Sequence, residues 1–369
     1  MGSYLNKPKT DKDSEDMEND RLMCGVSSMQ GWREKQEDAH VCLVDFDNDM
    51  SLFGVFDGHG GAEVAQYAVE MLPSLIKNEL FKQGDYENAL IKAYLDFDDS
   101  LIAPSVLRRL RTLRLKNGKT EESDNADVDD EKLVETELAG KDSGCTAVVA
   151  LLVKNKLYVA NAGDSRCVVS IAGKAHAMST DHKPRDKSEL KRILAAGGRV
   201  SSDGRINHGL NMSRALGDHM YKTNSLFTNM EQMITALPDV QIIDLKPENG
   251  DFIVLACDGI WNSLCSQKAI DFISNRIHCP DVKLSLICEE LFEVCLAPDT
   301  PNAGVGCDNM TCIIVKFKHQ QKSSLTDDVV EESDLVTKRS LTDDVEEESD
   351  LVTDCKKPKL DVTAPESVE

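Results

Sequence analysis

The 369-residue sequence lacks several features that would place it in a common class of protein. It has no run of about 18 apolar residues, the length that a membrane-spanning helix needs. Its N-terminus is polar and has no apolar signal-peptide core. Its 12 cysteines show no CxxC spacing, which argues against the common cysteine-rich zinc sites. We therefore expect no membrane span, and we interpret the cysteines as reduced thiols of a protein of the nucleus and cytoplasm.

The chain also has fewer basic than acidic residues. The chain has 42 lysines and arginines against 65 aspartates and glutamates, and its formal net charge is −23. So acidic a chain is not expected to bind free nucleic acid, because the phosphates would repel it. A cation or a basic protein is a better-matched partner. The hydrophobic fraction of 41% is enough for one large core or two modest ones.

The apolar pattern divides the chain into three parts. Residues 1–22 form a polar N-terminal arm with little to bury, residues 23–318 alternate strand and helix patterns, and residues 319–369 form an acidic tail. Strands are expected at 51–56, 146–153, 156–160, 167–171, 252–257 and 311–317. Helices are expected at 62–81, 86–101, 187–196, 266–277 and 283–295. Pro73 should kink or split the first helix.

Two acidic segments stand out from this pattern. An insertion at about 116–139 is interpreted as a solvated surface loop, and the tail contains a near-duplicate, 324–337 and 340–353, that we expect to be disordered. Lys356, Lys357 and Lys359 are either a nuclear-import signal or a charge patch on the tail. Gly2 is either a myristoylation site or part of an ordinary terminus.

Three aspartates lie where apolar strands end or begin. Asp57 and Asp258 each follow a strand, and Asp308 precedes one. Carboxylates held rigidly at buried strand ends would repel one another and become protonated unless a counter-charge is present. A hard cation that prefers oxygen ligands, Mg²⁺ or Mn²⁺, supplies that charge. Two such ions sharing a carboxylate, about 3.5–4 Å apart, could hold a hydroxide that attacks a phosphate ester.

Nearby residues could complete such a site. Gly58 has no side chain, so a cation can approach its carbonyl closely. His59 could protonate a leaving alkoxide, and Arg33 could grip phosphate oxygens. Glu37 and Asp38 could orient metal-bound water. Taken singly, the histidine is typical of a flexible turn and the charged residues are typical of a surface, but beside three strand-end aspartates the catalytic interpretation is favoured.

Seven motifs follow one another along the chain. They are GWREKQEDAH (31–40), VFDGHGG (55–61), SGCTA (143–147), ANAGDSR (160–166), SRALGD (213–218), ACDGIW (256–261) and DNMT (308–311). In this order they resemble the motifs of the metal-dependent protein serine/threonine phosphatases of type 2C. Among animal forms the gamma type is most similar, through the opening MGSYL, the segment MSRALGDHMYK (212–222), CLAPDT (295–300) and GCDNMTC (306–312).

The resemblance implies an α+β fold, a central antiparallel β-sandwich with helices on both outer faces in four α-β-β-α layers. It also implies phosphoprotein substrates and two Mg²⁺ or Mn²⁺ ions, with Asp57 as the bridging ligand. Asp258 and Asp308 would bind one ion and the Gly58 carbonyl the other. A hydroxide between the ions would attack phosphoserine or phosphothreonine directly, without a phosphoenzyme.

The remaining roles implied by the resemblance concern water, phosphate and a proton. Glu37 and Asp38 match residues that hold metal-bound water or support the site. Arg33 matches the phosphate-binding arginine, and His59 matches the general acid.

A third, weaker metal site is common in this family and depends on a further acidic residue. Asp164 matches one of its ligands, but this chain has Asn262 where an aspartate often stands. We therefore expect at most a weak third site.

Residues 182–211 match the family's mobile flap beside the active site, and Gly197, Gly198 and Gly204 would let it bend. His182 and His208 lack further ligands at metal-binding spacing, so we interpret them as flap or packing residues.

Two alternatives to a working phosphatase were weighed. The gamma type is associated with nuclear functions that involve histones and splicing factors. The resemblance therefore implies that such basic nuclear proteins are candidate partners of the acidic insertion. A nuclear acidic binding protein is thus the rival function, and deletion of 119–137 would separate the two. A catalytically dead phosphatase is disfavoured because the three aspartates, Arg33 and His59 are all present. We expect a monomer.

Overall fold

The computed structural model describes residues 4–117, 139–247, 250–279, 281–300 and 304–318. Most of the acidic insertion, the whole tail with its lysines, and Gly2 lie outside these residues. Among the described residues, no helix combines the length and apolarity needed to cross a membrane. The cysteines within them are all free, as expected from the sequence.

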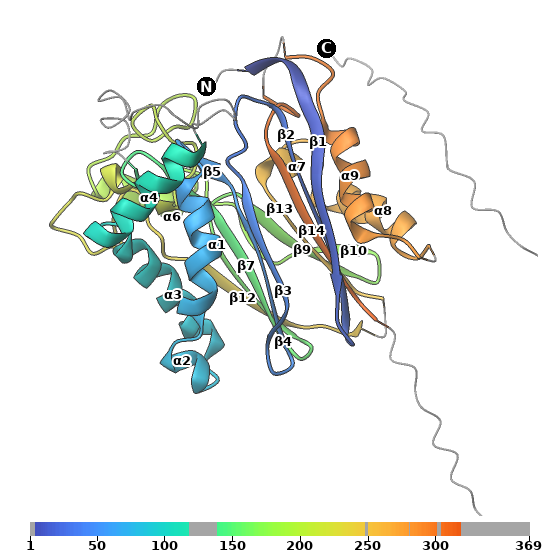
Figure 1. Ribbon diagram of the computed structural model, residues 1–369. Coiled ribbons are helices and arrows are strands. Elements are labelled where there is room, and N and C mark those ends of the chain that lie inside the picture. The colour runs from blue at the N-terminus through green and yellow to red at the C-terminus, as the bar shows by residue number, and fades with distance from the viewer. Residues whose placement is uncertain (1–3, 118–138, 248–249, 280, 301–303, 319–369) are drawn as a thin grey trace, which may run out of the picture. The chain divides into compact units, whose positions relative to one another are not determined.

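Two antiparallel sheets form the centre of the described domain (Figure 1). The six-stranded sheet has the order β1 (Tyr4–Glu18), β2 (Leu22–Arg33), β14 (Met310–Phe317), β13 (Phe252–Ala256), β9 (Arg166–Ile171), β10 (Lys174–Ala177). The five-stranded sheet has the order β12 (Asp239–Asp244), β8 (Lys156–Ala162), β7 (Ala147–Val153), β4 (Met50–Phe56), β3 (Ala39–Asp47). A small third sheet has the order β11 (Leu216–Gly217), β6 (Gly144–Cys145), β5 (Gly58–His59).

Helices cover the outer faces of both sheets (Figure 1). The five-stranded sheet carries α1 (Glu63–Ile76), α2 (Glu79–Lys82), α3 (Tyr86–Ser100) and α4 (Pro104–Asn117). The six-stranded sheet carries α7 (Asp258–Trp261), α8 (Ser266–Ile277) and α9 (Leu284–Cys295). The predicted α+β fold with four α-β-β-α layers is confirmed.

The alternation of side chains along β4 shows why its residues form a strand buried on both faces. Phe53 and Val55 point between the sheets, where residues from both sheets form one buried cluster. Leu52 and Phe56 point the other way and pack under the helices of α1–α4. Successive strand residues face opposite sides of a sheet, so an unbroken apolar run suits a strand that is covered twice.

The N-terminal segment has the polar sequence expected of an arm with little to bury, and none of the residues of β1 is fully buried, but it forms a strand. Residues Tyr4–Glu18 form β1, which pairs antiparallel with β2. Asp16 accepts hydrogen bonds from the backbone N–H and the hydroxyl of Ser285 on α9, and the hydroxyls of Ser14 and Ser27 lie 2.9 Å apart. An edge strand needs one backbone partner and tolerates polar side chains, so a polar sequence does not prevent pairing.

The first predicted helix is two helices, but Pro73 does not divide them. Helix α1 continues through Pro73 to Ile76. The break comes at Asn78, whose side chain accepts hydrogen bonds from the backbone N–H groups of Leu80 and Phe81 and so caps α2. The expectation that Pro73 splits the helix was wrong because a capping residue five positions later sets the boundary.

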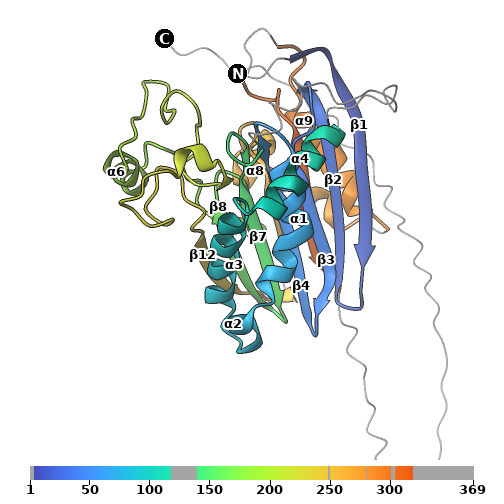
Figure 2. The same ribbon diagram turned by 60° about the vertical axis from the view of Figure 1, so that its left-hand side comes forward.

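The segment predicted to be a flap shares a small core with residues that follow it in the chain. It contains α6 (Lys187–Ala195), and η1 (His219–Tyr221) lies after it; Figure 2 shows α6 and its loops set to one side of the two sheets. The buried cluster combines Ile193 and Ile206 of the flap with Met212, Ala215 and Ile234. The mobility of this flap stays a prediction.

Candidate active site

Strands from both sheets bring five aspartates to one place. Asp57 follows β4, Asp164 follows β8, Asp258 opens α7 directly after Cys257 at the end of β13, and Asp308 precedes β14. Asp38 lies between β2 and β3. Burial raises the pKa of Asp57 well above its ordinary value, and the charges of Asp38, Asp258, Asp308 and Asp164 raise it further. The sequence-predicted aspartates therefore interact electrostatically, but Asp258 and Asp308 do not belong to the group of side chains that meet within ligand distance of one another among the described residues.

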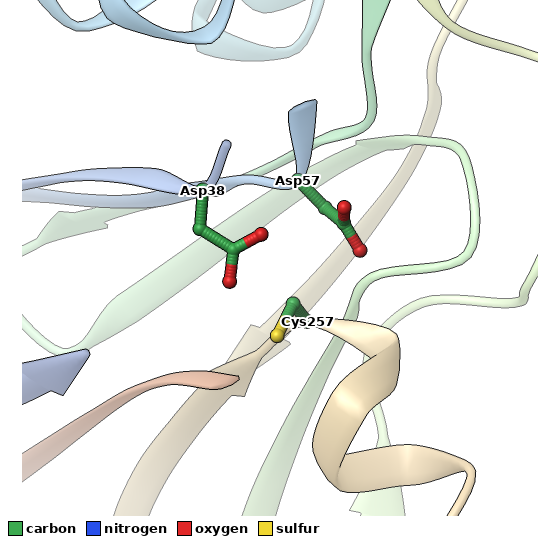
Figure 3. Close-up of side chains that lie close together, drawn as sticks. All are labelled: Asp38, Asp57 and Cys257. Atoms are coloured by element: carbon green, nitrogen blue, oxygen red, sulfur yellow. The ribbon is translucent and has the colours of Figure 1, made fainter. Parts of the chain in front are cut away.

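Asp38 and Asp57 come within metal-binding reach of each other and of Cys257 (Figure 3). One atom from each side chain lies within 4.8 Å of the other two. The sulfur of Cys257 is 3.2 Å from the Thr311 N–H and 3.5 Å from the Asn309 carbonyl. Burial raises the pKa of this thiol well above its usual range. Hard cations such as Mg²⁺ prefer the carboxylate oxygens to sulfur.

The acidic centre fits a hard cation. Burial raises the pKa of Asp38 to about 6, and burial together with Asp164 and Asp308 raises that of Asp258 to about 8. One carboxylate oxygen of Asp38 and one of Asp164 are buried without a hydrogen-bond partner among the described residues. Such orphaned, mutually repelling carboxylate oxygens are the donor set that Mg²⁺ or Mn²⁺ prefers.

Gly58 and Glu37 lie against each other at the edge of this centre. A Cβ atom added to Gly58 would be 2.2 Å from the Glu37 carbonyl oxygen, so only glycine fits here. Burial raises the pKa of the Glu37 carboxyl group. The backbone N–H of Glu37 donates to Asn309 at 3.0 Å, which ties the loop after β2 to the segment before β14.

Arg33 also lies at the centre. Its Nη2 donates to Asp308 Oδ2 at 2.7 Å, and both side chains are partly exposed, at 34% and 26%. A guanidinium beside the acidic cluster and open to solvent can receive phosphate oxygens.

His59 is held by a residue to which the sequence analysis gave no role. Its Nε2 lies 2.6 Å from Oδ2 of Asp218, whereas its Nδ1 is buried without a partner among the described residues. Burial alone would lower the pKa of His59, but the Asp218 carboxylate raises it above its usual value. Gly144 makes room for this pair, since a Cβ there would be 2.4 Å from Asp218 Oδ2.

A family model described as Protein phosphatase 2C matches residues 22–304. The chain belongs to the protein phosphatase 2C family. Probable protein phosphatase 2C 21 of Arabidopsis thaliana is 45% identical to it over 339 residues, with 88% of this chain and 94% of the relative covered. Protein phosphatase 1G of Rattus norvegicus, an animal gamma form, is 33% identical over 504 residues, with 86% and 93% covered. The chain is therefore a protein serine/threonine phosphatase.

Solved structures show the same phosphatase 2C fold. A crystal structure of a phosphatase from Toxoplasma gondii superposes with a TM-score of 0.62 at 21% identity, covering 84% of this chain and 96% of that one. At this identity the likeness concerns the fold alone. The resemblance inferred from the ordered motifs is confirmed by the family match.

One aspartate of this phosphatase 2C centre, Asp164, is already paired with a lysine side chain. The ammonium group of Lys183, at the root of the flap, donates to Asp164 and forms an ion pair with it. Asp164 is only 1% exposed. Asn262 donates from its side-chain amide to Asp258 at 3.0 Å. Asp164 is thus paired with a lysine, and Asp258 accepts a hydrogen bond from an amide.

The two flap histidines lie as the sequence analysis expected. The Gly163 N–H donates to Nδ1 of His182 at 3.2 Å, so Nε2 carries the proton and donates to Asp239 at 3.1 Å. His182 is buried and packs the flap against the end of β8. His208 is exposed on the flap, with φ of 64°.

Proposed function

We propose that this phosphatase hydrolyses phosphoserine and phosphothreonine in proteins with two Mg²⁺ or Mn²⁺ ions held by Asp57, Asp258, Asp308 and the Gly58 carbonyl. The observation that supports the proposal is the gathering of Asp38, Asp164, Asp258 and Asp308 around Asp57, whose pKa is raised by burial and by these four charges. Such a cluster is stable in its charged form only with added positive charge. When bound, the two ions would lower the pKa of a shared water and supply the hydroxide that attacks phosphorus.

The protein's own residues would bind the phosphate and move the proton. Arg33 would turn its free N–H groups to the phosphate oxygens. His59 would hold a proton at Nδ1 and give it to the leaving serine or threonine oxygen, while Nε2–H stays bonded to Asp218. Asp38, which accepts a hydrogen bond from the Thr311 hydroxyl at 2.7 Å, would be held in place to orient water.

A third ion is proposed to bind only weakly. Lys183 neutralises Asp164, and Asn262 offers an amide in place of a carboxylate. Isothermal titration with Mn²⁺ would compare the wild type with Asn262→Asp, in which we expect an additional binding event. Equal binding in both proteins would contradict the weak third site.

The test of the main proposal is hydrolysis of a phosphothreonine peptide with and without Mn²⁺. We expect metal-dependent turnover in the wild type and its loss in Asp57→Asn and in Asp258→Asn. Asp20→Asn is the matched control, since Asp20 is exposed in the turn between β1 and β2, at the opposite end of these strands from Arg33. A folded wild type without turnover, or turnover kept in both active-site variants, would contradict the proposal.

A further inference from the structure

The N-terminal strand reaches the phosphate-binding arginine. In the antiparallel pairing of β1 with β2, Tyr4 lies opposite Arg33. The Cζ atom of Arg33 is 5.9 Å from the centroid of the Tyr4 ring, within the range of a cation–π contact. Strand β1 therefore begins beside an active-site side chain.

A β-bulge brings Tyr4 to this place. Lys9 pairs with Gly31 and Tyr4 pairs with Arg33, so five positions along β1 correspond to two along β2. The extra residues bulge out of the ladder, and the pairing resumes only at Tyr4. Bulges next to active sites commonly redirect one side chain, which is what the Tyr4 ring needs in order to meet Arg33.

A second contact from β1 reaches the backbone of Arg33. The ammonium group of Lys9 donates to the side-chain oxygen of Gln30 at 3.5 Å, and the amide of Gln30 donates to the Arg33 carbonyl at 2.8 Å. The strand thus acts on Arg33 through its ring contact and through Gln30.

The strand is itself anchored to the domain. Asp16 accepts two hydrogen bonds from Ser285, and Lys12 forms an ion pair with Glu293, also on α9. The position of Tyr4 is therefore set by the six-stranded sheet and the helix that covers it.

An aromatic partner suits an arginine that must also bind phosphate. Without a substrate, the guanidinium group donates to Asp308, and its Nε is buried without a partner among the described residues. Asp308 is a proposed ion ligand, and sharing its charge with an ion would weaken its hold on Arg33. A ring face attracts the guanidinium plane but occupies none of its N–H groups.

We propose that Tyr4 is a positioning residue that holds the Arg33 guanidinium ready for the substrate phosphate. The inference rests on the proposed function, in which Arg33 binds that phosphate. It gives β1 a part in substrate binding in addition to its place in the sheet.

The test compares Tyr4→Ala, Tyr4→Phe and the matched control Asn6→Ala, an exposed position in the same bulge. KM and kcat for a phosphothreonine peptide, and the inhibition constant of inorganic phosphate, are measured with Mn²⁺ on the full chain. In Tyr4→Ala we expect both KM and the inhibition constant to rise about two- to fivefold, with a smaller change in kcat. Tyr4→Phe keeps the ring, so its KM and its inhibition constant for phosphate should equal those of the wild type. Asn6→Ala should also match the wild type.

A double-mutant cycle separates positioning of Arg33 from a general effect on the strand. All four proteins of the cycle are measured with the same small phosphoester, and in the Arg33→Ala background Tyr4→Ala should add nothing. An unchanged KM in folded Tyr4→Ala, or the same increase in both backgrounds, would overturn the role of Tyr4. Absence of metal-dependent turnover in the wild type would instead contradict the proposed function, so the two failures are distinguishable.

Discussion

At the scale of single residues, the active site depends on partners that lie far away in the sequence. His59 is held by Asp218, 159 residues later, and Arg33 is held by Asp308, 275 residues later. Each partner is itself buried or fixed by backbone contacts, as with the Asp218 N–H that donates to the Ser143 carbonyl. The orientation of each proposed catalytic side chain is thus a property of two distant segments.

Replacing Asp218 should affect substrates according to their leaving group. Asp218→Asn removes the charge that raises the pKa of His59, so protonation of a poor leaving group suffers. We expect hydrolysis of a phosphothreonine peptide to fall about 100-fold, and hydrolysis of p-nitrophenyl phosphate to fall by less than about tenfold, because nitrophenolate leaves without a proton. Steady-state kinetics on both substrates provides the measurement.

The control for this prediction is His59→Gln, which should show the same contrast between the two substrates. Equal losses on both substrates in Asp218→Asn, with the fold intact by circular dichroism, would mean that Asp218 supports the structure and not the proton transfer.

The sequence predicted the residues that sit in motifs at strand ends, and missed those whose role comes from packing. Asp57 and Asp258 were predicted because each ends an apolar run, and Asp308 because it stands just before one. Tyr4 and Lys183 carry no comparable signal, because their partners are fixed only when strands and flap assemble. Asp218 lies in the SRALGD motif, but its left-handed backbone conformation, with φ of 53°, is visible only in the structure.

At the scale of elements, sequence patterns predicted the strands and helices with a strong apolar period. The central strands β4, β7 and β13 are buried almost throughout. The edge strands β1, β3, β10 and β12 were missed because exposed polar residues interrupt their alternation. The inner strand β2 was also missed, because serine, glycine and glutamine interrupt its apolar residues. Helix α4 was missed for a related reason, since only Leu110 and Leu113 of its residues are buried.

The stability of the flap around α6 depends on the buried carboxylate of Glu189. Glu189 on α6 accepts hydrogen bonds from Arg214, Arg192 and the Ser213 hydroxyl. Burial alone would raise its pKa, but these groups together lower it to about 2. Because the pKa is lowered by folding, the stabilisation is complete above the ordinary carboxyl pKa and is lost as the pH falls toward 2.

We therefore expect Glu189→Gln to lower the free energy of unfolding at pH 7 by no more than about 3 kcal/mol, and this difference from the wild type to disappear near pH 2. Urea unfolding of both proteins between pH 2 and pH 7 gives the measurement, and the exposed Asp203→Asn on the same flap is the control. A difference that stays constant with pH would contradict the charge-based account.

At the scale of the whole molecule, the packing of the two sheets brings the carboxylates of the active-site aspartates close together, where their charges repel one another. In the metal-free state this crowding should reduce stability, so Asp57→Asn should melt about 2–5 °C higher than the wild type in EDTA.

Mn²⁺ at about 100 times its Kd should stabilise the wild type by about 2.7 kcal/mol, and Asp57→Asn much less. Differential scanning calorimetry with Asp20→Asn as control tests both, and a lower melting temperature of Asp57→Asn in EDTA would contradict the expectation.

The strand order of the six-stranded sheet has a consequence for biosynthesis. Strand β2 lies between β1 and β14, so Met29 pairs with Met310 across nearly the full length of the domain. Such distant pairings form slowly and cannot form before both strands exist. A nascent chain that has not yet reached β14 therefore has an open edge on β2 and no Asp308, and we expect it to need protection from aggregation until Phe317 has emerged. Dephosphorylation by this chain should begin only after the domain has been synthesised to its last strand.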